Sequence, residues 1–203
     1  MMKKRKIIKV LSGIFIAIVL ILGGSYYMSY RAATERNDRL IQQGFKLLEE
    51  QIATYIKENY SGVSKIEFSP IFVDGGDGFS MFTSRVVPMI YDTEGNQAIL
   101  GNSGPVDSGY DLGTSAALNL SLGNGGEEII EILDTNRNYV DVSKYDNLPD
   151  FAKLKTNTSI DENIQELNQA GYLSHVNKNE SGSPEAEIIY NIEIKEGSYR
   201  EWP

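Results

Sequence analysis

The sequence predicts an α+β protein with an N-terminal transmembrane helix, followed by a long helix packed on a curved antiparallel β-sheet. Three observations lead to this fold class: an uncharged run near the N-terminus, a helical apolar repeat after it, and short β-rich runs separated by glycine-rich turns. Segments with helical periodicity and segments with strand periodicity are grouped along the chain and do not alternate regularly. This grouping indicates an α+β architecture. The chain has no cysteine, so burial of apolar surface must stabilise the domain.

The first element is an uncharged run of 21 residues, 10–30, directly behind five cations. At about 1.5 Å per residue the run reaches roughly 30 Å, the thickness of a bilayer's hydrocarbon core. Because short cytoplasmic flanks collect Lys and Arg, we expect residues 1–9 to form a cytoplasmic basic tail and residues 10–30 a transmembrane signal anchor in the lipid bilayer. Residues 31–203 are then an extracellular domain of a single-pass cell-membrane protein.

A cleaved secretory signal is an alternative interpretation of the same run, and a buried soluble helix is another. The strongest apolar stretch, Ile14 to Leu22, is short enough for a signal peptide, and Gly23-Gly24-Ser25 is a candidate cleavage site. Tyr26 and Tyr27 follow at once and fit an interfacial aromatic belt. This placement favours an uncleaved anchor.

The charge balance restricts the partners of the part that follows the anchor. With the five N-terminal cations removed, 14 basic residues face 28 acidic ones, a net charge of −14 over residues 31–203. Such a surface repels nucleic acid and favours basic proteins or cations. The composition is typical of a small exported protein of a Gram-positive bacterium.

A helix is predicted over about residues 34–59. Apolar residues recur there at spacings of four, three, four and three, at Ile41, Phe45, Leu48, Ile52 and Tyr55. We expect this stripe to pack on a sheet, with a coiled-coil seam as the alternative. Relative to alanine, Gly44 lowers the stability of the helix by up to about 1 kcal/mol, and its presence indicates a close contact at this position.

The period changes to two after this helix. Residues 63–68 alternate as a half-buried strand does, and residues 79–91 form a second β-rich run with Pro88 inside it, which predicts an edge strand or a bulge. A tight turn at 92–96 leads into a short strand at 97–100. These runs predict an antiparallel meander of at least three strands.

The second half of the chain predicts two more strands and one helix. A strand is expected at 116–122, whereas residues 127–133 fit either a strand or a short helix. Ser159 and Glu162 form a capping box for a helix over 160–170 that ends at Gly171. A final strand is expected over 185–195.

The residues that could carry chemistry do not form an active-site pattern. The only histidine, His175, follows a helix and has no nucleophile motif to serve, so we expect a non-catalytic surface or packing residue and no enzyme. Neither a cofactor nor a metal is expected. Asp134, Asn136 and Asn138 match the first positions of a calcium loop, but Tyr139 stands where glycine is needed, and a polar turn is the simpler interpretation.

Surface features therefore point to a binding protein. The candidate partner-binding residues lie on glycine-rich loop tips, where ordinary solvated turns are the alternative interpretation: Asp74, Asp77, Asp107, Tyr110 and Asp111. Trp202, the only tryptophan, either covers an end of the sheet or serves as an exposed anchor for a partner.

The stretch from Ile52 to Gly101 resembles small exported proteins of streptococci and their relatives, most closely TipC-type immunity proteins that are paired with LXG toxins of the type VII secretion system. The phrase from Tyr55 to Phe68, YIKENYSGVSKIEF, is its most specific part. The resemblance implies a non-catalytic immunity protein that neutralises a secreted protein toxin at the outer face of the membrane by direct binding. An envelope binding or assembly protein is the alternative function.

Overall fold

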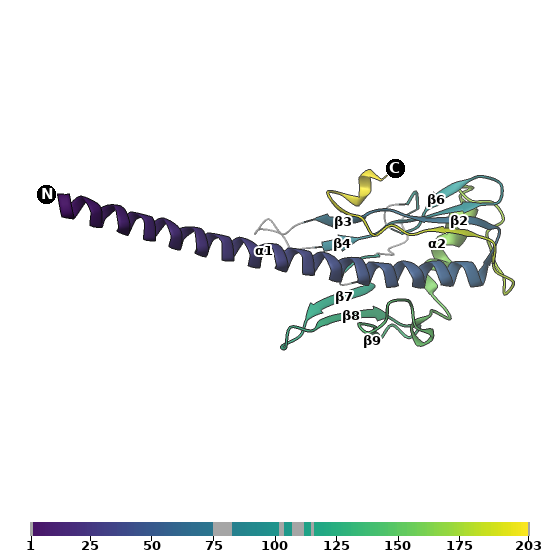
Figure 1. Ribbon diagram of the computed structural model, residues 1–203. Helices are drawn as coiled ribbons and strands as arrows, with labels where there is room; N and C mark the ends of the chain where they lie inside the picture. The colour runs from purple at the N-terminus through teal and green to yellow at the C-terminus, as the bar shows by residue number, and fades with distance from the viewer. Residues whose placement is uncertain (1, 75–82, 102–103, 107–111, 115, 203) are drawn as a thin grey trace. The chain divides into compact units, whose positions relative to one another are not determined.

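The computed structural model describes residues 2–74, 83–101, 104–106, 112–114 and 116–202, with side chains described from Leu20 onward except at Glu201. The chain divides into two compact units, Met1–Arg39 and Leu40–Pro203. The four predicted loop-tip residues after Asp74 lie outside the described residues. The structure is an α+β fold with a long helix and several antiparallel and mixed sheets, as the sequence predicts at this level (Figure 1).

The first unit consists of the N-terminal part of helix α1, which spans Met2–Asn59. Among the described residues, no helix is both long enough and apolar enough to cross a bilayer. This finding contradicts both the predicted transmembrane anchor at 10–30 and the predicted single-pass membrane location.

The part of α1 in the second unit, residues 40–59, lies in the core of that unit. The predicted stripe is buried throughout, from Ile41 to Tyr55, and the helix ends at Asn59 as predicted. Leu47, Glu49 and Ile56, outside the stripe, are also buried. In Figure 1 this part of α1 runs between strands β2, β3 and β4 on one side and β7 and β8 on the other. The helix is thus enclosed by sheets rather than laid on one of them.

The strands of the described residues form three main sheets and one small pair. A mixed sheet has the order β11-β2-β5-β6, from Glu187–Ile189, Val63–Phe68, Pro88–Asp92 and Gln97–Ile99. A second has the order β12-β3-β4, from Ile194–Glu196, Ile71–Asp74 and Thr83–Arg85. An antiparallel sheet has the order β7-β8-β9, from Leu118–Leu122, Glu128–Leu133 and Tyr139–Asp141, and Tyr60–Ser61 (β1) pairs with Asn177–Lys178 (β10).

The meander β2-β5-β6 is antiparallel as predicted, and residues 128–133 are a strand rather than a helix. The predicted run at 79–91 is two strands, because β5 begins at Pro88 and β4 belongs to another sheet. The edge position predicted for this run is wrong, since β5 lies between β2 and β6; the alternative of a bulge at Pro88 is wrong as well, because Pro88 pairs in register with Phe68 and the register shift of this strand pair falls between Val63 and Lys65. Pro88 instead opens a central strand, a position where a missing N–H is tolerated.

The final strand is also divided into two, β11 and β12, and each pairs in parallel with a partner rather than joining an antiparallel sheet. Their partners β2 and β3 are interrupted at Ser69 and Pro70, and the last strand is interrupted opposite that point. Four residues lie between Ile66 and Ile71 on one side, whereas five lie between their register partners Ile188 and Ile194. The additional residue bends the last strand away from the ladder.

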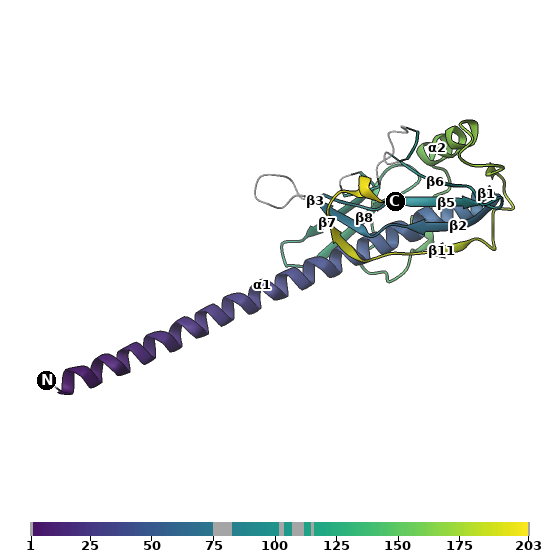
Figure 2. The same cartoon turned by 90° about the horizontal axis from the view of Figure 1, so that it is seen from above.

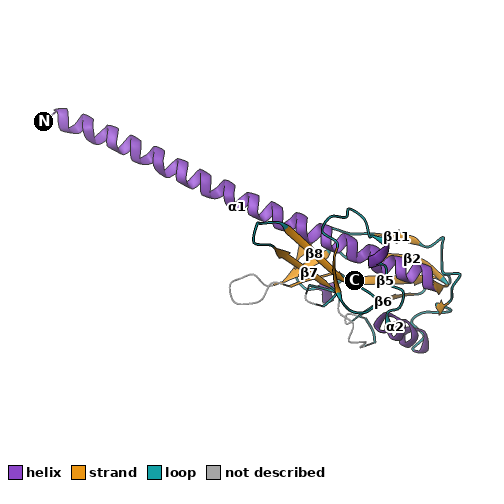
Figure 3. Ribbon diagram, turned by 90° about the horizontal axis from the view of Figure 1, so that it is seen from below, coloured by secondary structure: helices purple, strands orange, loops and turns teal. Residues whose placement is uncertain are grey.

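Helix α2 spans Thr158–Gln169 and lies beside β5 and β6 (Figures 2 and 3). Its N-cap is Asn157, whose Oδ1 accepts a hydrogen bond from the Ile160 amide, so the predicted capping box at Ser159 is wrong. Its end is as predicted: Gly171 has a φ of 77°, and the Tyr172 amide donates to the Leu167 carbonyl in a Schellman motif. Short 3-10 helices occur at Asp150–Ala152 and Tyr199–Glu201.

Candidate functional site

Only one of the predicted partner-binding residues falls in the described part of the chain. Asp74 is the exposed last residue of β3, opposite Thr83 of β4. Asp77, Asp107, Tyr110 and Asp111 lie outside the described residues, and the structure says nothing of whether they meet. A candidate site must therefore be built from other residues.

His175 and Asp134, which the sequence offered as a possible catalytic residue and a possible metal ligand, have no catalytic or metal-binding surroundings among the described residues. His175 is 78% exposed and lies 3.4 Å from Glu94. Asp134 Oδ1 accepts hydrogen bonds from the amides of Asn136 and Asn138, at 2.8 and 2.9 Å, which lowers the pKa of Asp134 and closes the β8–β9 hairpin. This is the geometry of a polar turn. No group of His, Asp or Glu side chains arranged to hold a metal ion occurs within the described residues.

A polar network joins α1, α2 and β10. The Asp161 carboxylate accepts hydrogen bonds from the hydroxyls of Tyr55 and Tyr60, at 2.7 and 2.6 Å, and it pairs with Lys178. Although burial opposes it, the hydrogen bonds from Lys178 and the two tyrosines lower the pKa of Asp161. Both tyrosines come from the phrase that carries the family resemblance. Their role here is to fix α2 against the end of α1.

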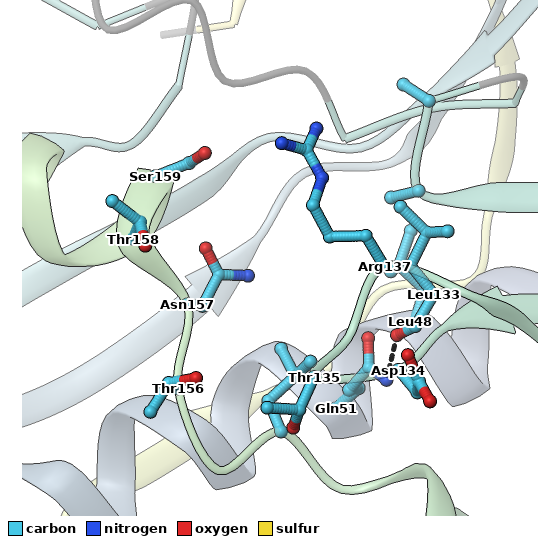
Figure 4. Close-up of a pocket in the computed structure, with 13 residues that line it drawn as sticks. Leu48, Gln51, Leu133, Asp134, Thr135, Arg137, Thr156, Asn157, Thr158 and Ser159 are labelled. Carbon is cyan, nitrogen blue, oxygen red and sulfur yellow. Dashed lines mark hydrogen bonds between the residues drawn. The ribbon is translucent and has the colours of Figure 1, made fainter.

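A cavity of about 400 Å³ opens in the second unit, between α1, the β8–β9 turn and the start of α2 (Figure 4). Its apolar lining includes Leu48 and Ala117, which are buried, together with Leu133 and Leu154. Polar side chains from three segments complete the wall, namely Gln51, Asp134, Thr135, Arg137, Thr156, Asn157, Thr158 and Ser159. An apolar lining with a few polar groups is typical of small-molecule sites.

Gln51 and Arg137 shape this cavity. The buried Gln51 amide donates to the carbonyls of Leu133 and Ala152, at 2.9 and 2.6 Å, and so ties α1 to both flanking segments. Arg137 lies in the β8–β9 hairpin turn. Its φ of 63° is a left-handed backbone conformation that is uncommon for residues other than glycine. Its side chain extends across the cavity, with the guanidinium toward the side where Ser159 lies (Figure 4).

The second candidate is a surface along residues 185–196, named here the C-terminal segment. Side chains of α1 hold its backbone at three points: Gln42 donates to the Ile192 carbonyl, Glu49 accepts from the Asn191 amide, and Lys57 donates to the Ala186 carbonyl. Figures 1 and 2 show the segment, in yellow and yellow-green, running beside α1 and β2. The segment is thus fixed on both sides although it occupies the sheet edge.

The C-terminal segment exposes apolar side chains among unpaired acids. Ile189, Tyr190 and Ile192 are 37%, 44% and 41% exposed. In the described part of the chain no ion pair involves its four exposed glutamates, Glu185, Glu187, Glu193 and Glu196. The sequence analysis missed this surface. Its signal was the run Ile188-Ile189-Tyr190, because neighbouring residues of a strand cannot all face the same core.

Comparison of the chain with protein-family models, curated proteins and solved structures found no match. The features of the molecule that bear on function are therefore the cavity, the C-terminal segment and the sequence resemblance.

Proposed function

We propose that this chain is a non-catalytic protein-binding module that neutralises a secreted protein toxin by direct contact. The observation that carries the proposal is the C-terminal segment, where Ile189, Tyr190 and Ile192 are exposed among glutamates that form no ion pair with any described residue. Protein interfaces typically have an apolar, aromatic-rich centre with a polar rim. This segment offers that combination on a backbone that is already held in place.

Tyr190 is the anchor of the proposed interface. Its ring stacks on Phe68 with centroids 6.0 Å apart and an angle of 9° between the planes, and Phe68 is itself buried in β2. An aromatic side chain that is ordered before binding loses little conformational entropy in the complex. We therefore assign most of the binding free energy to Tyr190 and its apolar neighbours.

The charge of the segment selects the partner. Four glutamates and Lys195 give residues 185–196 a net charge of −3. Acidic rims accelerate the capture of basic surfaces and disfavour acidic ones, so the partner presents Lys or Arg around an apolar patch. The resemblance to TipC-type immunity proteins supports a toxin as this partner. Neutralisation needs only a complementary surface, and the segment supplies one.

The test is capture followed by neutralisation. The purified full-length chain is immobilised, and secreted and envelope proteins of the producing cells are passed over it. The expected result is one stoichiometric secreted protein whose toxicity the chain suppresses. An envelope component bound in its place, or no partner at concentrations above about 10 μM, would refute the proposal of toxin neutralisation.

The Tyr190→Ala variant tests the proposed interface. Loss of the anchor is expected to weaken partner binding at least about tenfold, because removal of a central aromatic residue typically costs more than 1.4 kcal/mol. Tyr172→Ala is the matched control, since Tyr172 is 45% exposed and lies after α2, outside the segment. Equal loss in both variants would place the interface elsewhere.

A further inference from the structure

The Arg137 cavity is not used by the proposed interface, and its residues are suited to a ligand of their own. Its volume of about 400 Å³ falls in the range of small-molecule sites. Leu48, Leu133 and Leu154 supply an apolar surface, while the Arg137 guanidinium extends toward the side of the cavity where Ser159 lies (Figure 4). The cavity thus combines one cation with an apolar wall.

Arg137 is available to a ligand. Its guanidinium makes no hydrogen bond or ion pair within the described part of the chain, although the protein has nine more acidic than basic residues. Asp134 is the one carboxylate among the lining residues that the structure describes, and its Oδ1 is engaged by the amides of Asn136 and Asn138. An arginine that is not neutralised beside an apolar wall is suited to an anionic group, which its planar fork binds in a bidentate manner.

Hydroxyl donors face the same space from α2. The side chains of Thr158 and Ser159 make no hydrogen bond among the described residues, and Figure 4 shows the Ser159 hydroxyl directed toward the Arg137 side of the cavity. Asn157 is already engaged, because its side-chain oxygen caps the Ile160 amide. Arg137 and Ser159 can therefore hold one anionic group between them.

The surroundings favour a carboxylate over a phosphate. A phosphate carries up to two negative charges and usually requires several cationic groups. Among the described residues of the lining, Arg137 is the one cation, and the Asp134 carboxylate adds a negative charge to the same wall. A monoanionic, planar group with an apolar body matches both the charge and the lining. We propose that the Arg137 cavity binds a small organic carboxylate, with the carboxylate between Arg137 and Ser159 and the apolar body against Leu48, Leu133 and Leu154.

The probe is hexanoate, titrated into the ¹⁵N-labelled full-length chain and followed by amide NMR shifts. We expect saturable shifts confined to the cavity, in the β8–β9 turn and the first turn of α2, with hexanol giving no saturable shifts there. Inorganic phosphate is expected to bind at least about tenfold more weakly than hexanoate. No saturable binding of hexanoate below about 20 mM, or tighter binding of phosphate, would overturn the proposal.

Arg137→Met preserves the length of the side chain and removes its charge, and it is expected to weaken hexanoate binding at least about tenfold. Ser159→Ala is expected to weaken it about threefold, since one neutral hydrogen bond is lost. Lys155→Met is the matched control, because Lys155 is exposed next to the cavity but does not line it. Equal weakening in the Lys155 variant would show non-specific charge attraction and overturn the assignment. Each variant's fold is checked by its amide spectrum without hexanoate.

Discussion

Glu49 shows how a single buried carboxyl can couple folding to pH. Its side chain is fully buried; Oε2 accepts a hydrogen bond from the Asn191 amide at 3.0 Å, whereas Oε1 has no partner among the described residues. Burial, opposed by that hydrogen bond and aided by the neighbouring Glu50, raises the pKa of Glu49 from 4.5 to about 9. The folded protein therefore keeps a proton that the unfolded chain loses above pH 4.5. The free energy of unfolding consequently falls as pH rises from about 4.5 to about 9.

Glu49→Gln removes this dependence, because glutamine has no proton to lose and its carbonyl can still accept from Asn191. Between pH 4.5 and pH 7 the free energy of unfolding of the wild-type protein falls by about 3 kcal/mol, at 1.36 kcal/mol per pH unit. We expect the variant to be about 1–3 kcal/mol more stable than wild type at pH 7 and closer to it at pH 5, by urea denaturation. Glu58→Gln, an exposed change on the same helix, is the control. A variant less stable than wild type at pH 8 would contradict the argument.

Asp92 makes the free energy of unfolding depend on pH in the direction opposite to that of Glu49. It is 1% exposed, and its carboxylate accepts hydrogen bonds from the amides of Glu94, Asn96 and Ser174 and from the Asn96 side chain. Although burial raises it, these hydrogen bonds together lower the pKa of Asp92 below 3.8. The ionised carboxylate thus stabilises the fold above the unfolded pKa, and this contribution is lost as pH falls through the folded pKa.

Asp92→Ala removes the acceptor from three partly buried backbone amides and is expected to lower the free energy of unfolding at pH 7 by about 2–4 kcal/mol. The difference from wild type is expected to shrink as pH falls below 3.8 toward pH 3, because the unfolded chain then binds a proton that the folded carboxylate resists. Denaturant unfolding at both pH values measures it. Exposed Asp146, changed to Ala, controls for the loss of one acidic charge. A difference that grows toward pH 3 would refute the assignment.

At the scale of elements, substitutions at the start of α2 distinguish the observed cap at Asn157 from the predicted capping box at Ser159. Asn157 caps the helix through the Ile160 amide, whereas Ser159, the predicted cap, lies inside the first turn. Asn157→Ala is expected to cost about 1 kcal/mol of stability and Ser159→Ala less than about 0.5 kcal/mol. Thermal unfolding of both variants checks this. A larger effect of Ser159→Ala would support the capping box instead.

The elements show where sequence reasoning succeeds and where it fails. The stripe of α1, strand β2 and the Gly171 terminus were predicted because each depends on local period or backbone conformation. The division of the last strand was not predicted, since it follows from the interruption at Ser69 and Pro70 in its distant partner. Pro88 was predicted to lie at an edge or a bulge because it has no N–H, whereas pairing on both sides makes β5, which it opens, a central strand. Long-range pairing decided each of these errors.

The candidate sites were missed for a related reason. Arg137 and Ser159 are 22 positions apart and line one cavity only because the β8–β9 turn lies near the start of α2. Glu49 lies outside the predicted apolar stripe of α1, and a helix with one apolar stripe is expected to expose its other sides. In the folded unit, sheets enclose residues 40–59, and the C-terminal segment covers Glu49 through Asn191. The segment became a candidate interface only when its exposure was known.

At the scale of the whole molecule, the net charge of −9 makes partner capture dependent on salt. If the C-terminal segment binds a basic partner, the association rate is expected to fall about tenfold between 20 and 300 mM NaCl, because the screening length shortens over this range. The double variant Glu187→Lys/Glu193→Lys is expected to associate more slowly and to lose most of this salt dependence. Glu162→Lys/Glu166→Lys is the control with the same charge change on α2, which lies beside β6 at the other edge of the sheet from β11. Stopped-flow or surface-plasmon measurements give both rates; if the two double variants slow association equally, net charge rather than the segment governs capture.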